Sequence, residues 1–138
     1  MKSRAVVVVG STLGRRLAGP LSELGLTPEL ETRFNKVLEG VRKRPHAAIV
    51  MKEAELGIDA LELALNVRDV DGDVPIIIVC NRNEPHRLLA GVEKLQVFYL
   101  RGDVPPNHLA RQIGLLLEGI SEHAAASDRM KPGRKGQG

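Results

Sequence analysis

Short, continuously apolar runs alternate with segments of helical periodicity along most of this chain, and this alternation constrains the fold more than any other feature. Four runs, each bounded by Gly, Pro, Asn, Asp or charged residues, cover Ala5–Val9, Ala47–Met51, Pro75–Cys80 and Val97–Leu100. Runs of this kind are typical of strands that are buried on both faces, so we expect four central parallel strands. Thr27–Thr32 alternates only loosely, which predicts an edge strand.

Apolar residues at helical spacing fill the segments between these runs. The five stripes are Leu13, Leu17, Leu21 and Leu24; Phe34, Val37, Leu38 and Val41; Leu61, Leu65 and Val67; Leu88, Leu89 and Val92; and Leu109, Ile113, Leu116, Leu117 and Ile120. Because each pair of parallel strands needs a right-handed crossover, the pattern predicts an α/β fold. We expect a (βα)5 three-layer sandwich around a central five-stranded parallel sheet.

Parallel sheets of this type bind or react at the carboxyl ends of their strands. The residues that follow the predicted strands are therefore the first candidates for a site. They are Gly10 and Ser11, Lys52 and Glu53, Cys80 and Asn81, and Arg101–Asp103.

Composition is consistent with one domain. The chain has 138 residues, is 43% hydrophobic and contains one cysteine, so it can bury a core without an intrachain disulfide. We expect an ordered domain over residues 1–123 and a basic, disordered tail or linker over 124–138, where the periodicity stops. A signal pattern and a long apolar span are both absent from the sequence, which makes a cytoplasmic location the default expectation.

Several segments, in this order, resemble the receiver domain of bacterial two-component response regulators. Gly57-Ile58-Asp59-Ala60-Leu61-Glu62-Leu63 is similar to the segment that follows the phosphorylation site in receivers, and Pro45-His46-Ala47-Ala48-Ile49-Val50-Met51 resembles the strand that leads into that site. Pro75–Cys80 and Phe98-Tyr99-Leu100 resemble the fourth and fifth receiver strands. The resemblance covers roughly residues 5–119 and implies a flavodoxin-like, receiver-like fold.

The positions that carry receiver chemistry hold other residues in this chain. Gly10 and Ser11 stand where receivers have two acidic residues, and Lys52 stands at the phosphoacceptor, five residues before Gly57. Cys80 replaces the hydroxyl residue that ends the fourth strand, and Gly102 replaces the lysine after the fifth. The resemblance therefore implies a degenerate receiver that is not an enzyme and uses neither a metal nor another cofactor.

Lys52 has two possible roles. Its ammonium can reach water at the strand end while its methylenes cover apolar neighbours. Alternatively, it can occupy the vacated pocket and pair with Glu53, Glu55 or Asp103. The same carboxylates leave open a rescued metal site, although an ammonium cannot be the phosphoryl acceptor and repels Mg²⁺.

The loop Gly10-Ser11-Thr12-Leu13-Gly14 offers a second function, because glycines and hydroxyls between a strand and a helix can present amides to an anion. It lacks the full dinucleotide fingerprint and the lysine of a P-loop, so we expect a helix cap from Ser11 or Thr12 instead. Binding of a nucleotide or another anionic ligand stays open as the alternative.

The remaining reactive and charged residues favour no enzyme class. His46, His86, His108 and His123 lack metal-ligand spacing, and we expect surface or capping roles for them. Cys80 is expected to be a small buried apolar residue. The net charge of +3 raises the question of nucleic-acid binding, but the sequence offers no row of aromatic side chains on which bases could stack, so we do not expect nucleic acid as a partner.

The resemblance also implies where a partner binds. In receivers, the fourth helix, fifth strand and fifth helix form a docking or dimer face, which here corresponds to the stripe at 88–92, the run Val97–Leu100 and the stripe at 109–120. Tyr99 would contribute an aromatic side chain to this face. The resemblance thus implies a phosphorylation-independent protein-interaction module, with a signalling protein or a second copy of the chain as partner, and we expect no membrane contact.

Overall fold

Five parallel strands form one central sheet in the order β2-β1-β3-β4-β5. The computed structural model describes residues 4–52, 60–80 and 97–120. The strands are β1 (Ala5–Val9), β2 (Thr27–Glu31), β3 (Ala48–Lys52), β4 (Ile76–Cys80) and β5 (Val97–Arg101). Each predicted strand is therefore present, with bounds that differ from the prediction by at most one residue at an end.

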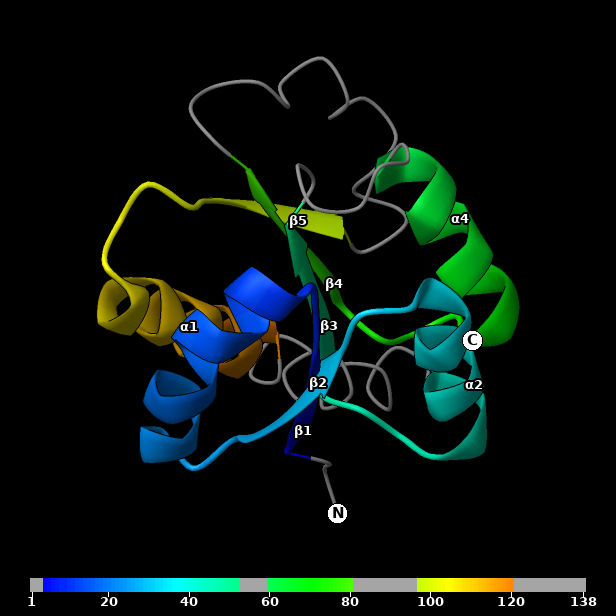
Figure 1. The fold of residues 1–138 in the computed structure, drawn as a ribbon. Helices are drawn as coiled ribbons and strands as arrows, with labels where there is room; N and C mark the ends of the chain where they lie inside the picture. The colour runs from blue at the N-terminus through cyan, green and yellow to red at the C-terminus, as the bar shows by residue number, and fades with distance from the viewer. Residues whose placement is uncertain (1–3, 53–59, 81–96, 121–138) are drawn as a thin grey trace, which may run out of the picture.

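Helices cover both faces of this sheet. Figure 1 shows α1 (Ser11–Glu23) and a C-terminal helix over residues 106–120 on one face, and α2 (Phe34–Lys43) and α4 (Ala60–Val70) on the other. The three-layer α/β arrangement is thus the flavodoxin-like, receiver-like fold that the sequence predicts. The helix expected around Leu88, Leu89 and Val92 lies outside the described residues.

The alternation of side chains along each strand divides the core into two parts. One part packs beneath α2 and α4 and contains Val7, Val9, Ile49, Met51, Ile76 and Ile78. The other packs beneath α1 and the C-terminal helix and contains Val6, Val8, Ala48, Val50, Ile77 and Val79. All of these side chains are almost fully buried. Both faces of β1, β3 and β4 are therefore covered, which explains why their sequences are apolar without alternation.

The prediction that all four apolar runs are central strands is wrong for Val97–Leu100. Among the described residues, β5 pairs only with β4 and forms one edge of the sheet, and its residues from Phe98 to Leu100 are partly exposed. An apolar run reports how well its faces are covered, and it carries no signal for the number of neighbouring strands. The expected edge position of β2 is confirmed.

Two leucines assigned to helical stripes are exposed. Leu24 follows the last residue of α1 and is 43% exposed, while Leu65 on α4 is 50% exposed. Among the described side chains of α4, Ala64 and Val67 are buried, and Val67 belongs to the predicted stripe. The small residue Ala64 faces the core beside Val67, so a stripe chosen by hydrophobicity alone misses this inward position and includes the exposed Leu65.

Candidate functional site

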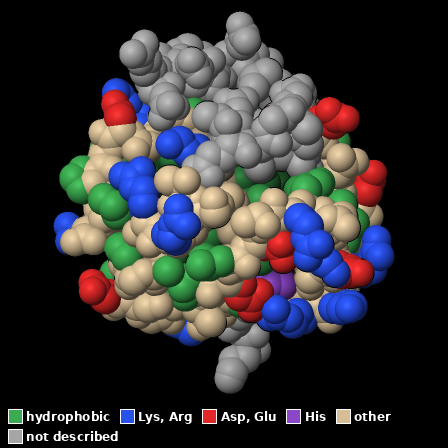
Figure 2. Space-filling model, in the orientation of Figure 1, with side chains coloured by type: hydrophobic (Ala, Val, Ile, Leu, Met, Phe, Trp, Pro, Cys, Tyr) green, Lys and Arg blue, Asp and Glu red, His purple; other side chains and the backbone are tan. Residues whose placement is uncertain are grey.

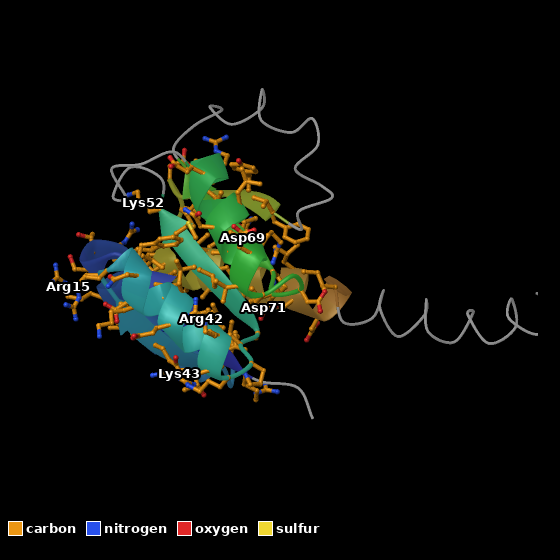
Figure 3. The ribbon with its side chains drawn as sticks, turned by 90° about the vertical axis from the view of Figure 1, so that its right-hand side faces the viewer. Arg15, Arg42, Lys43, Lys52, Asp69 and Asp71 are labelled. Atoms are coloured by element: carbon orange, nitrogen blue, oxygen red, sulfur yellow. The ribbon has the colours of Figure 1, made fainter. Side chains whose placement is uncertain are left out.

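Lys52 is the last residue of β3 and lies at the carboxyl edge of the sheet, where the sequence places it. It shares a face with Ala48 and Val50, which pack beneath α1, and its side chain is partly buried. Figure 3 shows Lys52 at the opposite end of the domain from Arg42 and Lys43. Its ammonium forms no ion pair with any acidic side chain that the structure describes. Glu53 and Glu55, two of its three expected partners, lie outside the described residues.

Gly10 lies beside Lys52, because Val9 pairs with Met51 in the preceding register position. The backbone of Gly10 has φ 113° and ψ 132°, a region that residues with a Cβ rarely adopt. Its amide donates to the Glu31 carbonyl at 2.9 Å, which ties the turn to β2. The position therefore needs glycine for its backbone conformation, and an acidic side chain there is disfavoured by geometry as well as absent from the sequence.

The expected helix cap at this turn is wrong. α1 begins at Ser11, its N-cap residue is Gly10, and neither Ser11 nor Thr12 makes a capping hydrogen bond from its side chain. Both side chains are exposed. The reason is position: Ser11 and Thr12 already belong to the first turn, whereas a capping hydroxyl must come from the residue before it.

Cys80 is the last residue of β4, and Gly102, which directly follows β5, lies beside it. The Gly102 amide donates to the Cys80 carbonyl at 2.8 Å, and the Cys80 thiol lies 3.6 Å from the Leu100 carbonyl oxygen. Both residues are buried. The expectation that Cys80 is a buried apolar residue is confirmed, and Gly102 has no side chain that could reach the site.

Asp103, the remaining acidic candidate, forms an ion pair with Arg101. The Arg101 guanidinium donates from Nε to Oδ1 at 3.1 Å and from Nη2 to Oδ2 at 2.5 Å. These bonds raise the pKa of Arg101. This carboxylate therefore pairs with Arg101 and, in the described part of the chain, forms no ion pair with Lys52.

The fold family implies Mg²⁺ at this edge, and the described residues do not fit it. Magnesium prefers oxygen ligands, usually carboxylates, in a near-octahedral shell. Position 10 offers only backbone atoms, Ser11 offers a hydroxyl, and Lys52 brings a positive charge. Among the described residues, the chain has no group of three His, Cys, Asp or Glu side chains that could hold a metal ion.

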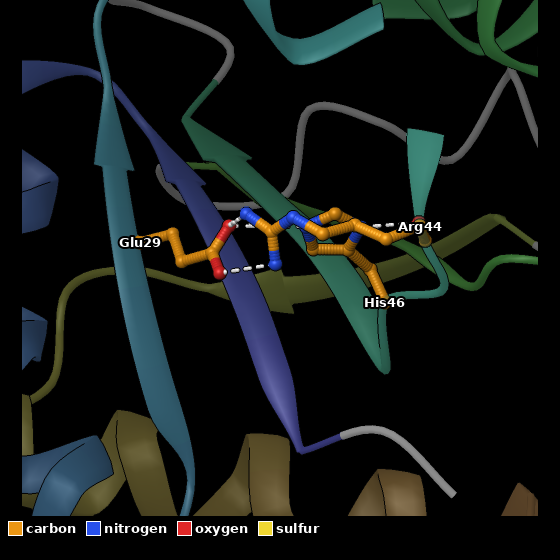
Figure 4. Close-up of polar contacts among 3 residues, drawn as sticks. All are labelled: Glu29, Arg44 and His46. Atoms are coloured by element: carbon orange, nitrogen blue, oxygen red, sulfur yellow. Dashed lines mark hydrogen bonds and ion pairs between the residues drawn. The ribbon is translucent and has the colours of Figure 1, made fainter. Parts of the chain in front are cut away.

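A second polar cluster lies at the opposite, amino end of the sheet. Figure 4 shows the side chains of Arg44 and His46 next to each other, both directed at the carboxylate of Glu29 on β2. Arg44 donates to the two Glu29 oxygens at 2.8 and 2.7 Å, and the His46 Nε2 lies 3.0 Å from Glu29 Oε1. These contacts, led by the Arg44 hydrogen bond, lower the pKa of Glu29.

The expectation that all four histidines are surface or capping residues is wrong for His46, whose side chain is fully buried. Its partner Glu29 is 17 residues away in the chain and on another strand, so local sequence carries no signal for the contact. His108 is exposed as expected. His86 and His123 lie outside the described residues.

Tyr99, the candidate interaction residue, is on β5. It is partly buried and packs against the part of the core beneath α2 and α4.

No helix in the described part of the chain is long and apolar enough to span a membrane. Figure 2 shows acidic side chains interspersed among the basic ones over α2, so this face has no large patch of one sign.

The order of strands and the two helical layers define the class: a receiver-like α/β domain. A CheY-like response regulator receiver domain from Methanospirillum hungatei superposes with a TM-score of 0.72 over 89% of this chain and 99% of that chain, at 12% identity. A receiver protein from Sinorhizobium medicae gives a TM-score of 0.66 over 84% and 95% of the two chains, at 15% identity. At these identities the likeness establishes the fold alone.

A third similar structure belongs to a family described as redox sensors in the streptococci that evolved from two-component response regulators. It has a TM-score of 0.70 and 17% identity, and the match covers 86% of this chain and 55% of that one. No protein-family model matches the sequence, and no curated protein matches it.

Proposed function

We propose that this chain is an atypical response-regulator receiver, which acts as a signalling and protein-interaction module without phosphorylation. The observation that carries the proposal is Lys52 at the end of β3, the strand that ends at the phosphoacceptor in the similar fold. Gly10 adds a second argument, because its φ of 113° disfavours any acidic replacement. On this proposal the domain is not an enzyme and uses no Mg²⁺.

Electrostatics supports the proposal. Two like charges held about 4 Å apart cost about 4 kcal/mol at an effective dielectric near 20. A divalent ion next to the Lys52 ammonium would meet at least this penalty, without the carboxylates that normally offset it. A lysine also has no carboxylate oxygen to attack a phosphoryl group.

Acetyl phosphate and Mg²⁺ test the proposal directly. The full chain and a conventional receiver are incubated side by side, and intact mass is measured. We expect a phosphoryl adduct on the conventional receiver and none on this chain. A phosphoryl adduct that forms on this chain and is absent from the Ser11→Ala variant would place the chemistry at this edge of the sheet and refute the proposal.

We further propose that the partner docks at the β5 side of the domain. Phe98, Tyr99 and Leu100 are partly exposed along this edge strand, and Leu115 on the C-terminal helix is 61% exposed. The partner is a signalling protein or a second copy of the chain. Light scattering at two concentrations distinguishes them: a concentration-dependent mass that Tyr99→Ala abolishes supports a homodimer, and a constant monomer mass supports a different protein.

The streptococcal family described as redox sensors evolved from response regulators is a parallel for this proposal, because its description names a signal other than phosphorylation.

The competing function is sensing of a nucleotide or another anion by the Gly10–Gly14 loop. One observation favours it: the first turn of α1 has neither a side-chain cap nor an acidic residue. A thermal-shift screen against nucleotides decides, because a ligand that binds only the folded state must raise the melting temperature. We expect no shift.

A further inference from the structure

The outer surface of α2 is basic at the carboxyl end of the helix. Lys36 and Glu39 form an ion pair with each other at 3.6 Å, so their charges offset. Arg42 and Lys43, in the last turn, are exposed and form no ion pair with any acidic side chain that the structure describes. The helix dipole favours cations at this end of a helix, so these two charges carry no inference by themselves.

The outer surface of α4 is acidic, and the helix dipole does not explain it. Glu62, Leu65 and Asp69 recur at helical spacing and are all exposed, Leu65 to 50%. Asp69 lies in the last turn, where the dipole disfavours an acidic side chain. Asp71 accepts hydrogen bonds from two backbone amides of the following turn, whereas Asp69 has no such contact within the described part of the chain. The charge of Asp69 therefore lowers the stability of its own helix.

These two surfaces are neighbours in the folded domain. Helices α2 and α4 contact each other on the same face of the sheet. Figure 3, which faces this side of the molecule, shows Arg42 and Lys43 on α2 and Asp69 on the neighbouring α4. We call the five residues Arg42, Lys43, Glu62, Leu65 and Asp69 the α2–α4 face. The face thus has a basic half and an acidic half, with an exposed leucine on the acidic half.

We propose that the α2–α4 face binds the same face of a second copy of this chain. A two-fold axis that runs parallel to the helices, between the two copies, places α2 of each copy opposite α4 of the other. Arg42 and Lys43 at the carboxyl end of α2 then lie opposite Asp69 at the carboxyl end of α4 in the second copy. The same contact forms a second time by symmetry, and Leu65 adds apolar area beside these charges.

The charge pattern selects a second copy over other partners. A partner surface of one sign would be repelled by one half of the face, whereas the face itself presents both signs in complementary order. The inference is independent of the proposed function, because the signalling partner is proposed at β5 and the C-terminal helix. A dimer through α2 and α4 leaves Tyr99 on β5 outside the interface.

Sedimentation equilibrium of the full chain tests the proposal with two charge-reversed variants. One carries Arg42→Glu and Lys43→Glu, and the other carries Glu62→Lys and Asp69→Lys. We expect the natural chain to dimerise, and each variant alone to dissociate at least about tenfold more readily, because like charges then face each other. An equal mixture of the two variants should dimerise as the natural chain does, because each reversed half meets a complementary one.

Two further variants locate the interface. Arg15→Glu combined with Arg111→Glu is the matched control, because it reverses two exposed charges on the helices that cover the other face of the sheet. This variant should keep the natural dissociation constant. Tyr99→Ala should keep it too. A dimer that Tyr99→Ala abolishes and charge reversal on α2 and α4 leaves intact would overturn the proposal and place the contact at β5.

Salt gives a second measurement that needs no variant. Raising the salt from about 0.1 M to about 1 M shortens the screening length from about 10 Å to about 3 Å, so the dissociation constant of the natural chain should rise at least about tenfold. A natural chain that stays monomeric, a dissociation constant that salt leaves unchanged, or a mixture of the two folded variants that stays monomeric would each overturn the proposal.

Discussion

Replacing Gly10 by aspartate should destabilise the domain, although aspartate is the residue that receiver chemistry would require there. The backbone at this position has φ 113° and ψ 132°. Holding a residue with a Cβ in such a region costs about 1–3 kcal/mol. Ser11→Asp is the matched variant, because it adds the same charge one residue later, in the first turn of α1. There the helix dipole stabilises an acid by about 0.3–1 kcal/mol.

Urea unfolding measures this difference. With an m-value of about 2 kcal/mol per molar, a loss of about 2 kcal/mol in Gly10→Asp lowers the midpoint by about 1 M. Ser11→Asp should leave the midpoint unchanged or raise it slightly. Gly10→Ala, which adds a Cβ without charge, should lose nearly as much as Gly10→Asp. Equal midpoints for the natural chain and Gly10→Ala would show that the backbone argument is wrong.

Two further predictions concern polar contacts away from this edge. The Arg68 guanidinium donates to the carbonyls of Asp71 and Val74, and burial lowers its pKa, so Arg68→Met should cost about 1–2 kcal/mol in urea unfolding; an unchanged midpoint would contradict this. The pKa of Glu29 is lowered from 4.5, chiefly by its hydrogen bonds from Arg44, so its stabilising contribution is present above pH 4.5 and is lost as the pH falls through the folded-state pKa. The free energy of unfolding should therefore decrease on acidification below about pH 4.5 more steeply in the natural chain than in Glu29→Gln, and parallel curves would refute this reading.

The strands could be predicted because a strand that is buried on both faces has a continuously apolar sequence. Val6 to Val9 are each nearly inaccessible, and no polar residue interrupts them. The position of β5 could not be predicted in the same way, because its apolar residues pack against helices while its outer edge has no partner strand among the described residues. Leu65 shows a related limit: its exposure depends on which side of α4 meets the sheet, and Ala64 faces inward there.

Some residues of the candidate site could be predicted from the sequence and others could not. Lys52 and Cys80 could be placed at strand ends because the strand bounds follow from the apolar runs. The positive φ of Gly10 had no local signal beyond the glycine itself. The contact between Glu29 and His46 depends on how β2 sits beside the connection into β3, which only the folded arrangement determines.

Magnesium titration followed by amide NMR tests the central claim most directly. The claim is that the carboxyl edge of this sheet does not attract a divalent cation, because the described positions there hold Gly10, Ser11 and Lys52. We predict that the amide resonances of these three residues stay unshifted up to millimolar Mg²⁺, while those of a conventional receiver move at the same concentrations. Saturable shifts centred on Ser11 and Lys52 would contradict the account.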